Sequence, residues 1–114
     1  MRRVYKLLGR DEWAAAQAGG VFEGSGVDLA DGYIHFSAAD QARETAAKYF
    51  AGRDDLVLLS VDADAFGAAM KWETSRGGAL FPHLYGSLPV ASVIEARALA
   101  LGEDGLPVLG ALPA

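Results

Sequence analysis

The sequence predicts an α+β fold, with a small mixed and split β-sheet and only a few helices. Three observations support this class: a length of 114 residues, several short segments of strand type, and helical patterns confined to the first half of the chain. A doubly wound parallel sheet would need a helix at every crossover between strands. We therefore expect a single domain over residues 1–114, with a core from about 4 to 99 and an irregular tail over 102–114.

The first expected elements are a strand, a short helix and a glycine-rich loop. Residues 3–8 place their side chains on two faces with the period of two that is typical of a strand. Asp11 is expected to cap a helix that is rich in alanine and that ends at Gly19 and Gly20. Residues 22–32 are expected to form a loop with one irregular helical turn.

A second strand and the best-defined helix are expected next. Residues 33–36 form the short strand, and Ser37 follows as the expected N-cap, with Asp40 at the third helical position. Ala42 and Ala46 then lie at helical spacing on one face, so this face is expected to be buried.

The second half of the chain is expected to consist mainly of strands. Residues 56–61 form a nearly continuous apolar run, which is typical of a central strand buried on both faces. Glycine and proline favour a loop over residues 74–86. The other expected elements are a helical turn within 62–69, a strand over 70–73, a short helix from Pro89 and a last strand over 93–99.

The composition excludes several classes of protein. The net charge of −5 argues against a protein that coats nucleic acid, because neutralising phosphates needs clustered lysine and arginine. The absence of cysteine excludes disulfide scaffolds and thiolate zinc sites, and it fits a cytoplasmic location. No apolar run approaches the roughly 20 residues that span a bilayer. Four basic residues near the N-terminus could hold one phosphorylated metabolite: Arg2, Arg3, Lys6 and Arg10.

His35 is the first candidate for a catalytic residue. It lies at the end of an expected strand and just before a helix N-terminus, which could bind a phosphate or a carboxylate. The alternative is a buried structural histidine whose charge state is set by burial. Ser37 joins the ligand-binding candidates as the expected helix cap. It is poorly placed as a nucleophile, because His35 is only two residues away along a strand.

Glu73 is the second candidate for a catalytic residue. A carboxylate at a strand end beside a glycine-containing loop could orient a sugar hydroxyl or stabilise a cationic transition state. The alternative is a solvated strand residue. Arg76, in that loop, could hold a phosphate or carboxylate in a bidentate grip, or it could be exposed.

Residues 81–86 are unusual for a loop, because aromatic, imidazole and proline groups gather there. We expect His83 and Tyr85 to line a site, since loops often carry function. The alternative is that this segment plugs the end of the core. Tyr5 and Trp72 could stack on a planar ligand, although aromatic residues in strands more often lie in the core. No metal-ligand spacing and no P-loop occur, so neither type of site is expected.

Five segments together resemble one bacterial family. They are Tyr5–Leu7, Asp31–Ser37, Leu56–Val61, Lys71–Glu73 and Phe81–Gly86. The combination is similar to the family catalogued as domain of unknown function 952, and the match extends from about Val4 to Leu99. The resemblance implies a fold similar to that of ADP-ribosyltransferases, which bind NAD in a cleft of a split mixed sheet.

The resemblance also implies roles for several side chains. In such a transferase, His35 would contact ribose hydroxyls and Glu73 would stabilise an oxocarbenium-like ribose. Tyr85 or Tyr5 would stack on the base. Glu95, on the last expected strand, is another candidate for the carboxylate.

Three functions remain open from the sequence. The first is a nucleotide- or NAD-related enzyme, of ADP-ribosyl or phosphoryl transferase type, around His35, Glu73, His83 and Tyr85. The second is a non-catalytic metabolite sensor that uses the same cleft. The third is a structural or interaction domain without a pocket. A cleft that both histidines share, with Glu73 nearby, would favour the first two.

Overall fold

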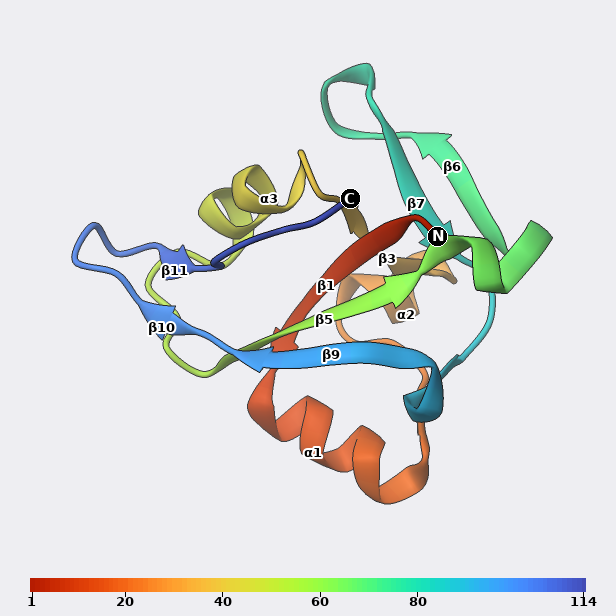
Figure 1. Cartoon of the computed structure of the whole chain (residues 1–114), viewed down its shortest axis with the longest axis horizontal. Helices are drawn as coiled ribbons and strands as arrows, with labels where there is room; N and C mark the ends of the chain where they lie inside the picture. Colours follow the sequence, from red (N-terminus) through yellow and green to blue (C-terminus); the bar gives the residue numbers. More distant parts are fainter.

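Short strands dominate the fold, and three α-helices lie around them (Figure 1). The computed structural model describes residues 1–114. None of the helices combines the length and the hydrophobicity that a membrane-spanning helix requires. The helices are α1 (Arg10–Gly19), α2 (Val27–Asp31) and α3 (Ala42–Tyr49), with 3-10 turns η1 (Ala63–Ala69), η2 (Arg76–Gly78) and η3 (Val90–Ser92). The strands are β1 (Arg3–Gly9), β2 (Val21–Phe22), β3 (Ile34–His35), β4 (Ser37–Ala38), β5 (Leu56–Asp62), β6 (Met70–Thr74), β7 (Leu80–Leu84), β8 (Leu88–Pro89), β9 (Val93–Ala98), β10 (Ala100–Leu101) and β11 (Pro107–Val108).

Two sheets carry the architecture. The larger has the strand order β4-β1-β5-β9, and the smaller has the order β3-β7-β6. Two further pairs, β2-β8 and β10-β11, add short ribbons. All pairings are antiparallel. The expected α+β class is therefore confirmed, with antiparallel sheets in place of one mixed sheet.

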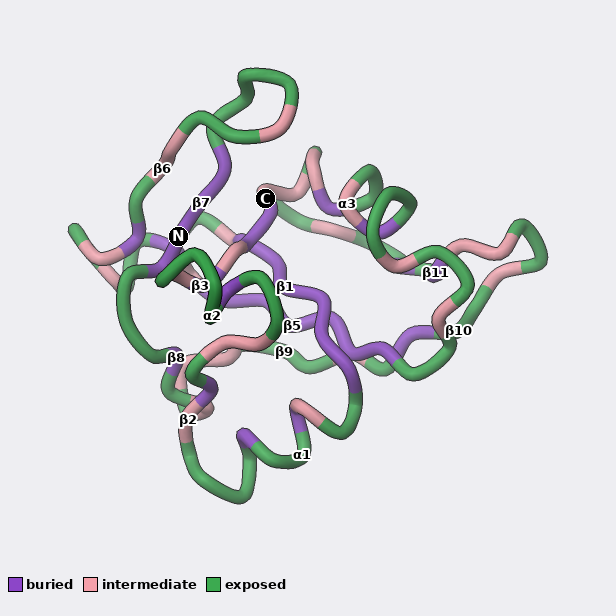
Figure 2. The backbone as a smooth tube through the Cα atoms, turned by 180° about the vertical axis from the view of Figure 1, so that it is seen from behind, coloured by how far each residue is buried: buried purple, intermediate pink, exposed green.

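Two apolar clusters lie on opposite faces of β1 and β5, which form the buried centre of the chain (Figure 2). Val4 and Leu59 belong to the larger cluster, which joins the main sheet to α1 and to the smaller sheet. Leu7 and Leu58 belong to the second cluster, with side chains of α3 and of the C-terminal tail. Because residues 56–61 are all buried, the predicted central strand is confirmed.

The predicted helix after β1 is confirmed, but its N-cap was placed two residues too late. Gly9 is the N-cap, and its N–H donates a hydrogen bond of 2.9 Å to the side chain of Glu12. Asp11 therefore lies in the first turn. The expected stop is present, since Gly20 is the C-cap with φ of 82°.

The predicted start of α3 is wrong. Ser37 lies in β4 and pairs with Tyr5 of β1, and the helix begins at Ala42 after the N-cap residue Gln41. Asp40 consequently precedes the helix. A long-range strand pairing thus replaces the local capping box at Ser37, because Ser37 pairs with the edge of β1 and adopts an extended conformation.

The prediction of a loop over residues 74–86 is wrong for its second half. That half contains β7, the central strand of the smaller sheet. Gly77 and Gly78 form the turn before β7, with φ of 68° and 80°. Pro82 suggested a loop, but it lies one residue outside the part of β7 that pairs with β3, so its missing N–H leaves that ladder intact.

The C-terminal tail packs back on the second apolar cluster, although only two residues of it form a strand. Leu109 is buried there. Arg43 and Arg97 donate hydrogen bonds to backbone carbonyls of the tail, of 2.7 and 2.9 Å respectively. The hydroxyl of Tyr5 donates another to the carbonyl of Pro113. These contacts tie the irregular tail to β1, α3 and β9.

Candidate functional site

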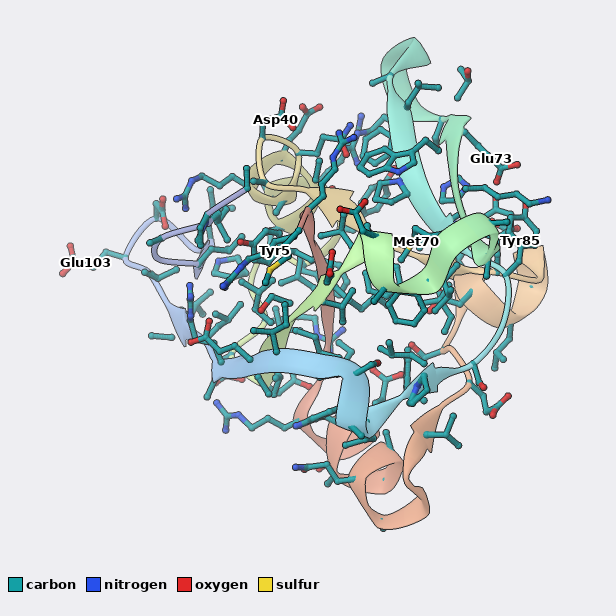
Figure 3. The ribbon with its side chains drawn as sticks, turned by 45° about the vertical axis from the view of Figure 1, so that its right-hand side comes forward. Tyr5, Asp40, Met70, Glu73, Tyr85 and Glu103 are labelled. Atoms are coloured by element: carbon teal, nitrogen blue, oxygen red, sulfur yellow. The ribbon has the colours of Figure 1, made fainter.

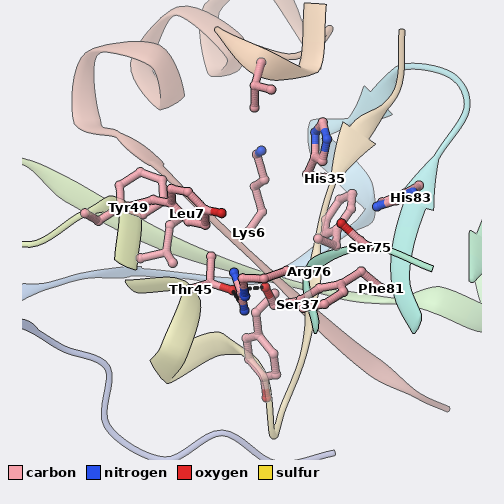
Figure 4. A pocket seen from close by; sticks show the side chains of 14 residues that line it. Lys6, Leu7, His35, Ser37, Thr45, Tyr49, Ser75, Arg76, Phe81 and His83 are labelled. Atoms are coloured by element: carbon pink, nitrogen blue, oxygen red, sulfur yellow. Dashed lines mark hydrogen bonds between the residues drawn. The ribbon is translucent and has the colours of Figure 1, made fainter. Parts of the chain in front are cut away.

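A cavity of about 370 Å³ opens beside the unpaired part of the β1 edge (Figure 4). The edge is free there because β4 pairs only with Val4 and Tyr5, so the ladder stops before Lys6. The cavity is lined by side chains from β1, α2, α3, the smaller sheet and the turn before β7. The lining residues are Tyr5, Lys6, Leu7, Val27, His35, Phe36, Ser37, Thr45, Tyr49, Phe50, Ser75, Arg76, Phe81 and His83.

The structure brings six of the nine predicted site residues to this cavity. They are Tyr5, Lys6, His35, Ser37, Arg76 and His83. The two histidines are cross-strand partners on β3 and β7, and their ring centroids are 5.2 Å apart. Both histidines therefore share one cleft, with Glu73 in contact with His83, which is the arrangement that favours a site over a purely structural domain.

Asp28 organises one wall of the site, and sequence reasoning missed it. Its carboxylate accepts hydrogen bonds from the Nζ of Lys6, at 3.0 Å, and from the Nδ1 of His35, at 2.7 Å. Backbone N–H groups of Ser25 and His35 donate to it as well. The partners come from β1, β3 and the glycine-rich segment before α2, so no local pattern could have indicated Asp28.

The surroundings of Asp28 keep it ionised. Burial would raise the pKa of this carboxyl, but the hydrogen bond from His35 and the charge of Lys6 outweigh burial and lower the pKa to about 2. The other ring nitrogen of His35, Nε2, lies 3.0 Å from the carboxylate of Asp31. His35 can donate to both carboxylates only with both ring nitrogens protonated, as an imidazolium ion.

His83 is held by the second predicted catalytic residue. Its Nδ1 lies 2.9 Å from the Oε1 of Glu73. The same Oε1 accepts a hydrogen bond of 2.8 Å from the hydroxyl of Tyr85. The bonds from His83 and Tyr85 lower the pKa of Glu73. The hydrogen bond to Glu73 is the main cause that raises the pKa of Tyr85 to about 12, and burial is the second.

Tyr33 joins the two histidines and was not among the predicted site residues. Its ring stacks on His83, with centroids 4.3 Å apart and an angle of 18° between the planes. The centroids of His35 and Tyr85 lie 4.6 and 5.1 Å from that of Tyr33. The signal in the sequence was the period of two in the expected strand, which put Tyr33 and His35 on one face.

Arg76 lines the cavity near Thr45 and Ser37, apart from the two histidines (Figure 4). Its Nη2 donates a hydrogen bond of 3.2 Å to the hydroxyl of Thr45, which is bonded in turn to Ser37 at 2.9 Å. The guanidinium lies over the rings of Phe81 and Tyr49, at 4.9 and 5.7 Å from their centroids. Thr45 was not predicted, because on α3 it reads as one more polar helix residue.

Three predicted site residues do not line the cavity. Glu73 and Tyr85 bond to each other on the side of the molecule away from Tyr5 (Figure 3). Trp72 packs against the larger apolar cluster, and the guanidinium of Arg2 covers its ring at 3.8 Å. The alternative carboxylate, Glu95, forms an ion pair with Arg97 on β9 and is also absent from the lining.

No group of three or more histidine, aspartate and glutamate side chains is arranged to hold a metal ion.

Comparison with known proteins identifies the family. A family model described as a protein of unknown function (DUF952) matches residues 7–96. The chain belongs to this family. It is similar to the crystal structure of protein CC0527 from Caulobacter crescentus, with 58% identity, 95% of each chain covered and a TM-score of 0.92. The solution NMR structure of CC0527 gives 58% identity and a TM-score of 0.88, with 96% of this chain and 95% of that chain covered. No curated protein matches the chain.

The family predicted from five sequence segments is thus confirmed as DUF952. The similarity of its fold to ADP-ribosyltransferases and the binding of NAD stay predictions. The roles of His35 and Glu73 as catalytic residues also stay predictions.

Proposed function

We propose that this DUF952 protein binds a small phosphorylated ligand of the nucleotide class in the cavity beside β1. One observation carries the proposal: no carboxylate lines the cavity, and the polar side chains of its lining are hydroxyl, amine, guanidinium and imidazole groups. The volume of about 370 Å³ lies within the range of small-molecule sites, roughly 300–1,000 Å³. A ligand rich in acceptor oxygens satisfies such a lining.

Arg76 is the principal anion-binding group in this proposal. Its side chain is only 16% exposed, yet it makes one hydrogen bond, to Thr45, and its ion pair with Glu44 is long, at 3.6 Å. A guanidinium carries five N–H donors in a planar fork that matches a phosphate. Arg76 therefore has donors left for a ligand, and the hydroxyl groups of Thr45 and Ser37 lie beside it.

Aromatic rings supply a second recognition element. Phe36, Phe50, Phe81 and Tyr49 line the cavity with Arg76 and Ser37. Such rings bind planar groups by stacking or edge contacts. A phosphate at Arg76 and a base among these rings together describe a nucleotide, which agrees with the NAD-related ligand that the family resemblance implies.

Ligand binding is better supported than a ribosyl transfer in which Glu73 acts as the catalytic carboxylate. The transfer would need a carboxylate facing the ribose. Glu73 faces His83 and Tyr85 and is absent from the lining. We therefore propose a metabolite-binding cleft first, with an NAD-dependent transferase as the alternative that requires Glu73 to reach the ligand.

Isothermal titration calorimetry of the purified chain with ADP-ribose, NAD, AMP and adenosine tests the proposal. We expect the three phosphorylated compounds to bind and adenosine to bind much more weakly. Arg76→Met should weaken binding by roughly 30-fold or more, which corresponds to about 2 kcal/mol. Lys48→Met is the matched control, because Lys48 is exposed on α3 and absent from the lining. Equal binding of AMP and adenosine, or an unchanged affinity in Arg76→Met, would refute the proposal.

A further inference from the structure

We propose that His83 is the proton-accepting catalytic residue of the cleft, acting on a phosphorylated ligand that carries a free hydroxyl group. In this arrangement Glu73 and Tyr85 are positioning residues, which act through His83 and do not touch the ligand. The identity of the ligand rests on the proposed function. The state of His83 does not, because it can be measured in the ligand-free protein.

The hydrogen bonds of His83 leave one ring nitrogen free. Nδ1 lies 2.9 Å from the carboxylate of Glu73. An ionised carboxylate can only accept hydrogen bonds, so Nδ1 must carry the proton that it donates. In the neutral ring the proton then lies on Nδ1, and Nε2 carries a lone pair. Nε2 has no hydrogen-bond partner in the protein, although the side chain is only 3% exposed and lines the cavity.

Three groups fix the orientation of that ring. Tyr33 stacks on one face of His83, and Glu73 holds Nδ1. Tyr85 donates to the same oxygen of Glu73, at 2.8 Å, and so holds the carboxylate in place. A histidine oriented by a carboxylate, with its second nitrogen directed at a ligand site, is the usual arrangement of a general base.

His35, only one strand away, is built differently. Both of its nitrogens are bonded to carboxylates, Nδ1 to Asp28 at 2.7 Å and Nε2 to Asp31 at 3.0 Å. Neither ring nitrogen of His35 is therefore free to meet a ligand. Its side chain is nevertheless 28% exposed, far more than that of His83. Exposure and proton-accepting capacity therefore point to different histidines, which makes the inference testable.

The position of His83 relative to Arg76 suggests how the ligand lies. The imidazoles of His35 and His83 are close together, whereas Arg76, Thr45 and Ser37 gather at a separate part of the lining (Figure 4). A phosphate bound by Arg76 then leaves a hydroxyl elsewhere on the ligand to meet Nε2 of His83.

The proposed step is a proton transfer that balances within the site. The hydroxyl O–H bond breaks as the N–H bond to Nε2 forms, and the oxygen keeps the electron pair. The imidazolium charge is stabilised by the Glu73 carboxylate. No oxidant or reductant is needed.

Diethyl pyrocarbonate is the probe, because it carbethoxylates an imidazole nitrogen only through a free lone pair. The chain has two histidines, so peptide mapping by mass spectrometry assigns the product without ambiguity. We expect His83 to react about tenfold or more faster than His35, despite its lower exposure. Long-range ¹H–¹⁵N NMR should show the Nδ1–H tautomer of His83.

Glu73→Gln should slow the reaction at His83 by roughly tenfold, because an amide can place the ring proton on Nε2 instead. Glu103→Gln is the matched control on an exposed carboxylate with no side-chain hydrogen bond, and its rate should equal that of the wild type.

Each result decides one claim. Faster modification of His35, or an Nε2–H tautomer of His83, would overturn the inference even if ADP-ribose binds through Arg76. Rapid modification of His83 with no binding of any phosphorylated compound would overturn the proposed function and leave the reactive histidine established. Where ADP-ribose binds, it should protect His83 and adenosine should not; binding without protection would show that His83 does not face the ligand.

Discussion

Asp28 should make the stability of the fold depend on pH in acid. The native environment lowers the pKa of its carboxyl from 3.8 to about 2. Each unit corresponds to about 1.4 kcal/mol, so the bonds to Asp28 contribute about 2 kcal/mol to the free energy of unfolding. Because the folded pKa is lower than the unfolded one, this contribution is present above about pH 4. It is lost as the pH falls toward 2, where Asp28 becomes protonated in both states.

Urea denaturation followed by tryptophan fluorescence measures this contribution. At pH 7 we expect Asp28→Asn to lower the free energy of unfolding by roughly 3–5 kcal/mol, because Lys6 and His35 lose their partner. Between pH 5 and pH 2 the wild type should lose about 2 kcal/mol more than Asp28→Asn does. Asp40→Asn is the control, since Asp40 is exposed and forms no side-chain hydrogen bond. Parallel pH profiles for wild type and Asp28→Asn would refute the reasoning.

Two further predictions concern the same region. Gly24→Ala should destabilise the fold by about 1–3 kcal/mol, because φ is +108° and the new Cβ would lie 2.9 Å from the Cβ of Asp28. Gly19→Ala, which meets nothing within 4 Å, should have little effect, and equal unfolding midpoints for the two variants would contradict this account. Glu73→Gln should lower the pKa of Tyr85 from about 12 toward its ordinary value, because the phenol loses a carboxylate partner. An ultraviolet titration of phenolate absorbance in alkali checks it, and an unchanged curve would contradict the bond between the two residues.

Elements whose signal is local were predictable from the sequence. The period of two in β1 and the unbroken apolar run of β5 identified two central strands, because each pattern reports the burial of its own side chains. Ser37 and Pro82 misled the prediction for the opposite reason. Each carries a strong local preference, for a helix cap and for a loop, that pairing with a distant strand overrides.

The site shows the same division. His35 and His83 were identifiable because imidazoles and neighbouring aromatic residues are uncommon at strand ends and in loops. The partners of these histidines were harder to assign. Asp28 reads as an ordinary loop residue, and only the folded chain brings Lys6 and His35 to it. Glu73 was among the predicted site residues, but the sequence could not show that it faces His83 rather than the cavity.

The strand order of the main sheet has a consequence for synthesis on the ribosome. Leu7 of β1 pairs with Leu58 of β5, which in turn pairs with Arg97 of β9. The first strand to be made therefore has no complete partner until half of the chain has been translated, and the sheet is finished only near the last residues. Contacts so distant in sequence form slowly and leave apolar strands exposed in the nascent chain. A stalled or shortened product should consequently be prone to aggregation and should depend on chaperones in a way that the finished protein does not.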